Sequence, residues 1–378
     1  MKANAIQLLS SAGLFGPAVI VPVILQDQLG ASKDLIGLIA GSFAAASFIS
    51  SYFFGRASDV HGRRVILLIG LFLSGIATAL QAVSVLVGGL EFFIAVRILI
   101  GFASGIFPAA LLAYAYDTRG GKMGSFSALG AGGWGVGNLA VGLFGLFYEQ
   151  AYAQVYLMCT IIIFASFVIA LELPFAKETS MSVPLFPKAL IKRNAPVYAS
   201  MLIRHTGANM IWVTYPLFLI SIGASPEMVG LIYAVNAFGQ FGFMAIMDRF
   251  DPTVLVAVGL ASSAATFYTF TLVGSFWEII PSQILLAAAY SSLYVGSLRY
   301  VMDRNEEKAT ASGLLSSTMS VSGIIGPVLG GLAATAFGFK GTIMIATLMS
   351  VAALGIFLYA LNRSGEFYRL RIHSWSRI

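Results

Sequence analysis

The sequence predicts an all-α membrane protein with twelve transmembrane helices in two pseudo-symmetric six-helix halves. Composition is the first observation, because 58% of the 378 residues are hydrophobic and only 10% are charged, whereas a soluble domain has about 25% charged residues. The length of the apolar segments is the second, because each is close to the roughly 20 residues that a helix needs to cross a bilayer. A partial repeat of the first half in the second half is the third.

The apolar segments are bounded by Gly, Pro and charged residues, and none of them shows the short alternating pattern of barrel strands. The first segment lacks the small-residue cleavage site of a signal peptide, so we expect it to be retained as a helix. We expect spans at residues 5–26, 34–54, 65–87, 91–114, 124–147, 152–174, 197–221, 227–247, 253–274, 277–299, 309–335 and 340–361.

Basic residues predict how the spans are oriented. Of the 22 Lys and Arg residues, Lys33 and Lys340 fall on one side, Arg97 and Arg204 fall inside predicted spans, and the others fall on the side of both termini. Cytoplasmic loops carry the excess of Lys and Arg. We therefore expect a multi-pass protein of the plasma membrane with both termini in the cytoplasm. The net charge of +6 then needs no nucleic-acid partner.

A single long loop divides the chain, and we expect its prolines, up to Pro196, to keep it free of helix. The halves resemble each other, since "LGASKDLIGLI" at 29–39 matches "IGASPEMVGLI" at 222–232. Parallel six-span repeats are typical of one transporter architecture. The predicted units are an N-terminal half, a cytoplasmic linker, a C-terminal half and a basic-aromatic cytoplasmic tail, at residues 1–176, 177–195, 196–362 and 363–378.

Short motifs identify the family that the chain resembles. "GRASDVHGRR" (Gly55–Arg64) resembles the loop signature of the major facilitator superfamily, and "RILIGFASG" (Arg97–Gly105) resembles its fourth-helix motif. "GAGGWGVGNLAVG" (Gly130–Gly142) is similar to the glycine-rich fifth-helix motif of antiporters, with Asn138 in place of its proline. The second-half copy of the loop signature, "MDRFDP" at 247–252, is degenerate. The resemblance covers the whole chain and implies the fold of that superfamily, secondary transport and alternating access.

The resemblance also implies a gate at the loop signature. Gly55 has no side chain, so it lets the second and eleventh helices approach each other closely. Asp59 can accept hydrogen bonds from a helix N-terminus or from Arg63 and Arg64. We expect these contacts, together with Gly62, to close the cytoplasmic side when the cavity opens outward.

The family resemblance implies that spans one, four, seven and ten line a central cavity. Polar residues inside spans usually face the protein interior. We expect the substrate site among Arg97, Arg204, His205, Asn209, Trp212, Tyr215, Gln283, Tyr290 and Tyr294, with Gln7, Tyr114, Trp134, Asn138, Asn236 and Gln240 as further candidates. The alternative interpretation of Arg97 is that it only connects helix four to the neighbouring helices.

The charges inside the spans predict the class of solute. Arg97 and Arg204 lie in spans, whereas no carboxylate lies near the middle of any span. Because an unpaired buried charge is costly, we expect an anionic or zwitterionic solute. The candidates for proton coupling are His205, Asp27 and Glu172. His205 has an alternative reading as a neutral hydrogen-bonding residue.

These observations predict a secondary active transporter that moves a small organic solute, with protons as a candidate coupling ion. A multidrug or amphiphile efflux antiporter is the alternative, and a lipid flippase or a transporter-like sensor is a more distant one. No phosphate loop and no metal-ligand spacing occur in the sequence, so we expect no enzyme activity, no metal and no cofactor. We expect a monomer whose partners are its solute and the surrounding lipids.

Overall fold

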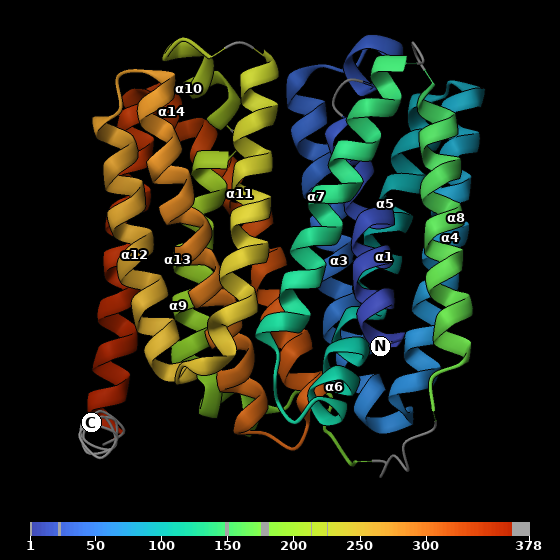
Figure 1. Ribbon diagram of the computed structural model, residues 1–378, viewed down its shortest axis with the longest axis vertical. Helices are drawn as coiled ribbons and strands as arrows, with labels where there is room; N and C mark the ends of the chain where they lie inside the picture. The colour runs from blue at the N-terminus through green and yellow to red at the C-terminus, as the bar shows by residue number, and fades with distance from the viewer. Residues whose placement is uncertain are drawn as a thin grey trace.

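The computed structural model describes residues 2–21, 24–147, 151–174, 181–212, 214–224 and 226–364, and almost all of them are helical. Figure 1 shows the helices running side by side along the long axis of the molecule. The α-helices are α1 (Lys2–Phe15), α3 (Lys33–His61), α4 (Arg63–Val87), α5 (Leu90–Ile106), α6 (Pro108–Thr118), α7 (Gly124–Phe147), α8 (Tyr152–Leu171), α9 (Lys188–Trp212), α10 (Tyr215–Ser221), α11 (Pro226–Ile246), α12 (Pro252–Leu272), α13 (Phe276–Asp303) and α14 (Lys308–Arg363).

These helices make the twelve predicted crossings, so the predicted fold class is confirmed. Five crossings are assembled from broken or fused helices. The first consists of α1 and two short helical turns, η1 (Gly16–Val19) and η2 (Ile24–Gln28), the fourth of α5 and α6, and the seventh of α9 and α10. Helix α14 holds the eleventh and twelfth crossings. Within the described residues, eight helices are long and apolar enough to cross a membrane alone.

Proline and glycine explain where the broken crossings are interrupted. Pro108 begins α6 directly after Phe107, and proline also lies in the first turn of η1 and of α10. Proline removes a backbone donor and its ring clashes with the preceding turn, so it starts a new helix more easily than it continues one. Gly338 interrupts α14 with φ of 68°, a conformation that glycine adopts without strain.

Two expectations about loops are wrong. The signature at 55–64 is not a loop, because α3 continues to His61 and α4 begins at Arg63, with the turn made at Gly62 alone, where φ is 100°. Pro196 does not lie in an irregular linker but inside α9, which begins at Lys188. The residues before Pro196 are mostly good helix formers, and the proline that starts the helix is Pro187, just before its first turn, where a missing N–H costs little.

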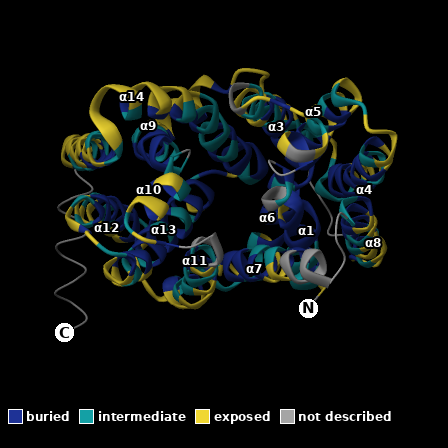
Figure 2. Cartoon of the chain, turned by 90° about the horizontal axis from the view of Figure 1, so that it is seen from above, coloured by how far each residue is buried: buried dark blue, intermediate teal, exposed yellow. Residues whose placement is uncertain are grey.

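The helices form two groups, α1 with α3–α8 and α9–α14 (Figures 1 and 2). The groups pack against each other through α3 with α14 and through α7 with α11. Viewed from above, the exposed residues lie mainly on the outer rim of the bundle (Figure 2), and many of them are large and apolar, as expected of a surface that faces lipid. The boundaries predicted for halves, linker and tail stay a prediction, and residues 365–378 of the tail lie outside the described part.

One end of the bundle carries the N-terminus of α1, the turn between α3 and α4, and the end of α14 (Figure 1). Its basic side chains include Lys2, Arg63, Arg119, Arg193 and Lys308. We call this end the basic face, and we call the other end the opposite face.

Candidate substrate cavity and gate

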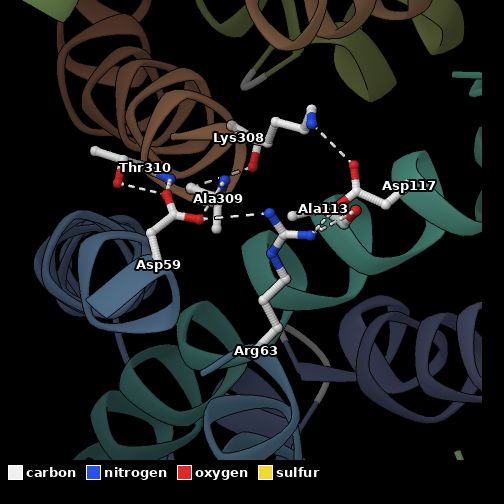
Figure 3. Close-up of polar contacts among 8 residues, drawn as sticks. Asp59, Arg63, Ala113, Asp117, Lys308, Ala309 and Thr310 are labelled. Carbon is white, nitrogen blue, oxygen red and sulfur yellow. Dashed lines mark hydrogen bonds and ion pairs between the residues drawn. The ribbon is translucent and has the colours of Figure 1, made fainter. Parts of the chain in front are cut away.

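Asp59 joins the two groups of helices at the basic face (Figure 3). It lies in the last turn of α3, where its buried carboxylate reaches the first turn of α14. Oδ1 accepts the Ala309 N–H at 3.3 Å, and Oδ2 accepts the N–H and the hydroxyl of Thr310, both at 2.7 Å. The first N–H groups of a helix have no partner within the helix, and its dipole favours an anion there. Asp59 therefore caps α14 across the boundary between the groups.

Arg63 and Asp117 extend this contact into an ion-pair chain (Figure 3). Arg63 Nη2 lies 3.8 Å from Asp59 Oδ1, and Arg63 Nη1 donates to Asp117. Lys308, at the start of α14, donates to Asp117 Oδ1 at 2.9 Å. Both acids therefore bind the start of α14. Asp59 binds two backbone N–H groups and the Thr310 hydroxyl, and Asp117 binds the side chain of Lys308. Arg64 instead donates to the carbonyl of Leu171 at 2.6 Å, within the first group.

Gly55 lies one turn before Asp59, where α3 and α14 approach most closely. A Cβ atom at Gly55 would lie 2.9 Å from the carbonyl oxygen of Ala309 and 3.0 Å from the Cα of Gly313. Both neighbours are backbone atoms, so no side-chain rotation would relieve the contact. The glycine of the signature is therefore needed for the approach of the two helices.

A second acid makes the same kind of contact, and the sequence analysis missed it. Asp248, in the short helix η3 (Met247–Arg249), accepts the N–H of Gly124 at 2.7 Å and that of Ser125 at 3.1 Å. These residues begin α7, so an acid from the second group caps a helix of the first. The only signal was the acid in the degenerate copy of the loop signature.

A cavity of about 550 Å³ lies between the two groups of helices. It is lined from both groups, and His205 is the sole ionisable side chain other than tyrosine among its described lining residues. Its polar wall consists mainly of hydroxyl groups, with Gln7, Asn209 and Tyr294 beside them. We call it the serine lobe after Ser10, Ser11, Ser47, Ser51, Ser104, Ser316 and Ser320.

A second cavity, of about 380 Å³, lies mainly among helices of the second group. His205 and Asn209 line both cavities, so the two adjoin at these side chains. Among the described residues, no Asp or Glu lines either cavity. We call the second cavity the aromatic lobe, and it is lined by Trp134, Arg204, His205, Asn209, Trp212, Tyr233, Asn236, Gln240, Leu286 and Tyr290.

Arg204 brings a positive charge to the aromatic lobe. Its side chain is only 2% exposed. Its Nε donates to Ser263 Oγ at 2.9 Å, and the guanidinium carbon lies 5.2 Å from the centre of the Phe267 ring and 5.9 Å from that of Tyr290. Within the described residues its Nη2 has no hydrogen-bond partner, and neither has Nδ1 of the neighbouring His205.

Three predicted site residues line neither lobe. Tyr215 and Gln283 are buried behind the aromatic lobe and bond to each other. They are joined to the lobe by an amide chain, in which Gln240 donates to Asn236 at 2.5 Å and Asn236 donates to Gln283 at 3.2 Å. The structure therefore places Tyr215 and Gln283 where they hold the lining residues in position.

Arg97 is the third of these residues. Its guanidinium lies 4.8 Å from the centre of the Phe43 ring and beside Tyr156, within the first group of helices. Tyr294 lines the serine lobe and stacks on Tyr290 of the aromatic lobe, with 5.7 Å between ring centres. Of the nine residues first predicted for the substrate site, the six that line the lobes are Arg204, His205, Asn209, Trp212, Tyr290 and Tyr294. The further candidates that line them are Gln7, Trp134, Asn236 and Gln240.

The candidates for proton coupling lie in different environments. His205 lies at the junction of the two lobes. Glu172 lies at the basic face, where its side chain is 64% exposed and pairs with Lys2 at 3.1 Å. The side chain of Asp27 lies outside the described part. His205 is thus the candidate that the structure places in the cavity.

Comparison with known proteins supplies the family. The profile of the Major Facilitator Superfamily matches residues 4–195 and 197–368. An uncharacterized MFS-type transporter of Methanocaldococcus jannaschii is 25% identical over 370 residues, which are 92% of this chain and 94% of that protein. The quinolone resistance protein NorA of Staphylococcus aureus is 23% identical over 337 residues, which are 82% of this chain and 84% of that protein.

A solved structure shares the fold. A bacterial homologue of the iron transporter ferroportin, solved in an outward-facing state, matches with a TM-score of 0.80 at 12% identity, over 95% of this chain and 98% of that chain. With the family profile covering nearly the whole sequence and the twelve-span fold shared with a known transporter, the chain belongs to the Major Facilitator Superfamily and is an integral membrane secondary transporter.

Proposed function

We propose that this transporter moves a small anionic or zwitterionic organic solute through the serine and aromatic lobes by alternating access. The observation that carries the proposal is Arg204, a buried cation at the wall of a cavity whose described lining includes no carboxylate. An uncompensated charge at this depth costs several kcal/mol. A negatively charged group on the solute would offset that cost while the solute is bound.

The contacts at the basic face support the alternating-access part of the proposal. Asp59 and Asp248 each cap a helix of the other group, and both contacts lie at the same end of the bundle. In this state the basic face is held closed. Release of both caps would let the two groups separate there and open the cavity toward that face.

The basic face is proposed to be the cytoplasmic face, with both termini on that side of the plasma membrane, because Lys and Arg concentrate on cytoplasmic loops. His205 is the proposed coupling residue. Its ring lies where the lobes adjoin, so a proton and the solute would reach the same place. We propose that a single chain suffices for transport.

Efflux of amphiphilic compounds is the second candidate function. Two observations favour it, namely the 23% identity to a quinolone resistance protein over 82% of this chain and the aromatic lining of the second lobe. Both functions use the same cavity. They differ in the direction of net movement and in how many kinds of solute bind.

Two pairs of spin labels test alternating access. Cys159 is the single cysteine, so a Cys159→Ser background allows labelling of His61→Cys with Glu306→Cys at the basic face, and of Leu38→Cys with Phe337→Cys at the opposite face. These four native side chains are exposed. We expect one distance to lengthen as the other shortens when pH or solute changes the population. Two distances that remain constant, or that always change together, would contradict the proposal.

A thermal-shift screen of the purified protein against solute classes, repeated at two pH values, tests the solute. A ligand that binds the folded state raises the unfolding temperature by mass action. We expect organic anions or zwitterions to stabilise the protein, with a dependence on pH. Stabilisation by lipophilic cations instead would contradict the charge assignment and leave the transporter assignment intact.

A further inference from the structure

We propose that the aromatic lobe binds a planar aromatic monocarboxylate, with the carboxylate on Arg204 and the ring among the aromatic side chains of the lobe. This inference rests on the proposed function and narrows its solute class. It assigns different tasks to the two lobes: the aromatic lobe holds the charged aromatic end of the solute, and the serine lobe accommodates any uncharged polar remainder.

The arginine accounts for the carboxylate. Arg204 lines the lobe and uses Nε to bond Ser263, while its buried Nη2 has no hydrogen-bond partner among the described residues. Guanidinium groups match the planar geometry of a carboxylate, and charge-assisted bonds of this kind are about twice as strong as neutral ones. Among the described lining residues, Arg204 is the sole Arg or Lys. One such charge matches a singly charged ligand better than a dianion.

The aromatic lining accounts for the ring. Trp212 and Tyr233 lie 6.0 Å apart between ring centres, and Tyr290 is backed by Tyr294 in a stack with 14° between the ring planes. Aromatic pairs prefer stacked or edge-to-face arrangements, which contribute to binding beyond the apolar area that they bury. An aromatic ligand gains this contribution to its binding free energy, and an aliphatic ligand of similar size does not.

Trp134 gives the lobe one wall from the other group of helices. It belongs to α7, whereas the remaining lining residues belong to α9, α11 and α13. With the amide of Asn138 oriented to satisfy both neighbours, its oxygen accepts the indole N–H of Trp134 at 2.9 Å and its nitrogen donates to the carbonyl of Gly16 at 3.2 Å. The indole is therefore fixed to the first group. Movement of α7 relative to α11 would remove this wall, which links binding of the ring to the conformational change.

Four probes separate charge from aromaticity. Isothermal titration calorimetry on the full-length protein in nanodiscs would compare 2-naphthoate with 2-naphthamide, cyclohexanecarboxylate and 2-naphthylmethylammonium. We expect naphthoate to bind at least about tenfold more tightly than each of the others, or about 1.4 kcal/mol. Equal binding of the aliphatic acid would overturn the assignment of the ring. Equal binding of the amide or the ammonium compound would overturn that of the carboxylate.

Two variants assign the preferences to residues. Arg204→Gln should abolish the preference for naphthoate over naphthamide while naphthamide still binds, which also shows that the variant is folded. Trp134→Leu should weaken both naphthalene probes at least threefold and leave the preference unchanged. The matched control is Trp277→Leu, at an exposed tryptophan in the first turn of α13, which should bind all probes as the wild type does.

The outcomes also separate this inference from the proposed function. If Arg204→Gln still prefers naphthoate over naphthamide, the inference is overturned. If that variant does not fold, the comparison of the four probes on the wild type decides. If the spin-label distances exchange but naphthoate shows no preference, the aromatic-carboxylate assignment fails and alternating access stands. If the distances do not exchange, alternating access fails whatever binds in the lobe.

Discussion

The backbone N–H of Thr310 donates to the Asp59 carboxylate at 2.7 Å, so the end of a helix in the first half caps the start of a helix in the second. The reverse contact has the same length, since the N–H of Gly124 donates to Asp248 at 2.7 Å. Each half therefore supplies one acid and receives one. Both contacts lie at the basic face, so they join the two groups of helices at that end of the bundle.

Asp59→Asn should leave the protein folded and inserted but shift it toward the state that is open at the basic face. The amide cannot supply the anionic acceptor that three donors now share. Hydrogen bonds to charged groups contribute about 1.5–3 kcal/mol each, so we expect a large change in population and a severe loss of transport. The distance between labels at His61→Cys and Glu306→Cys measures the shift.

The matched control is Asp251→Asn. Asp251 also caps a helix, accepting the N–H groups of Thr253 and Val254 at 2.8 and 3.2 Å, but this helix, α12, is its own. Loss of a helix cap costs about 0.5–2 kcal/mol. We expect a modest fall in unfolding temperature and no change in the label distance. Normal transport by Asp59→Asn in reconstituted vesicles would defeat the gating interpretation.

Asp248→Asn should shift the same distance in the same direction. The carboxylate of Asp248 caps α7 with two bonds, to Gly124 and Ser125, so its loss releases the second contact between the halves. Combining it with Asp59→Asn should open the basic face further than either change alone. If Asp248→Asn left the distribution at wild-type values, Asp248 would be a local helix cap and Asp59 would hold the face without it.

The sequence was sufficient to predict the spans and the fold class, because long apolar segments in a chain with few charges have few alternatives to crossing a membrane as helices. It could not tell which side of a helix faces the cavity. Arg97 and Arg204 both lie inside spans, yet only Arg204 lines a lobe. In a membrane the lipid side and the packed side of a helix are similarly apolar, so periodicity does not reveal that Tyr215 and Gln283 lie behind the wall.

Asp248 shows a different limit of prediction from sequence. Its motif has no glycine and, in Arg249, a single arginine, and its partners are backbone N–H groups 123 and 124 positions away. Every residue type except proline can supply a backbone N–H, so the sequence of the partner carries almost no signal. Only the crossing of α7 and α11 shows that the acid has a helix to cap.

Gly55→Ala should weaken closure of the basic face. The new methyl group would lie 2.9 Å from a carbonyl oxygen and 3.0 Å from a Cα atom of α14, so the helices must separate, and overpacking of this kind costs about 1–3 kcal/mol. The control on the same helix is Gly41→Ala, because a Cβ atom at Gly41 would have no atom from outside its own stretch of α3 within 4 Å. We expect the control to be neutral or stabilising, since alanine favours a helix over glycine. Equal label distances in the two variants would contradict the role of Gly55.

Residues 181–185, which follow the first group of helices, are hydrogen-bonded to α3. Tyr52 and Arg56 donate to the carbonyls of Leu185 and Val183 at 2.8 and 2.7 Å. The Met181 N–H donates to the carbonyl of Asp59 at 3.1 Å. The three α3 residues share one face of the helix, and their partners are every second residue of the segment, at positions 181, 183 and 185. Residues 181–185 are therefore held along α3.

This attachment predicts that residues 181–185 move with the first half when the basic face opens. Hydrogen–deuterium exchange of a peptide covering them should be equally slow in wild type and in Asp59→Asn, because the bond from Met181 goes to the backbone of residue 59, which the substitution leaves in place. Arg56→Gln combined with Tyr52→Phe should speed exchange several-fold, since both side-chain donors to the segment are lost or weakened. Tyr359→Phe, at an exposed tyrosine near the end of α14, serves as the control. Fast exchange in Asp59→Asn would show instead that the segment detaches on opening and acts only as a tether.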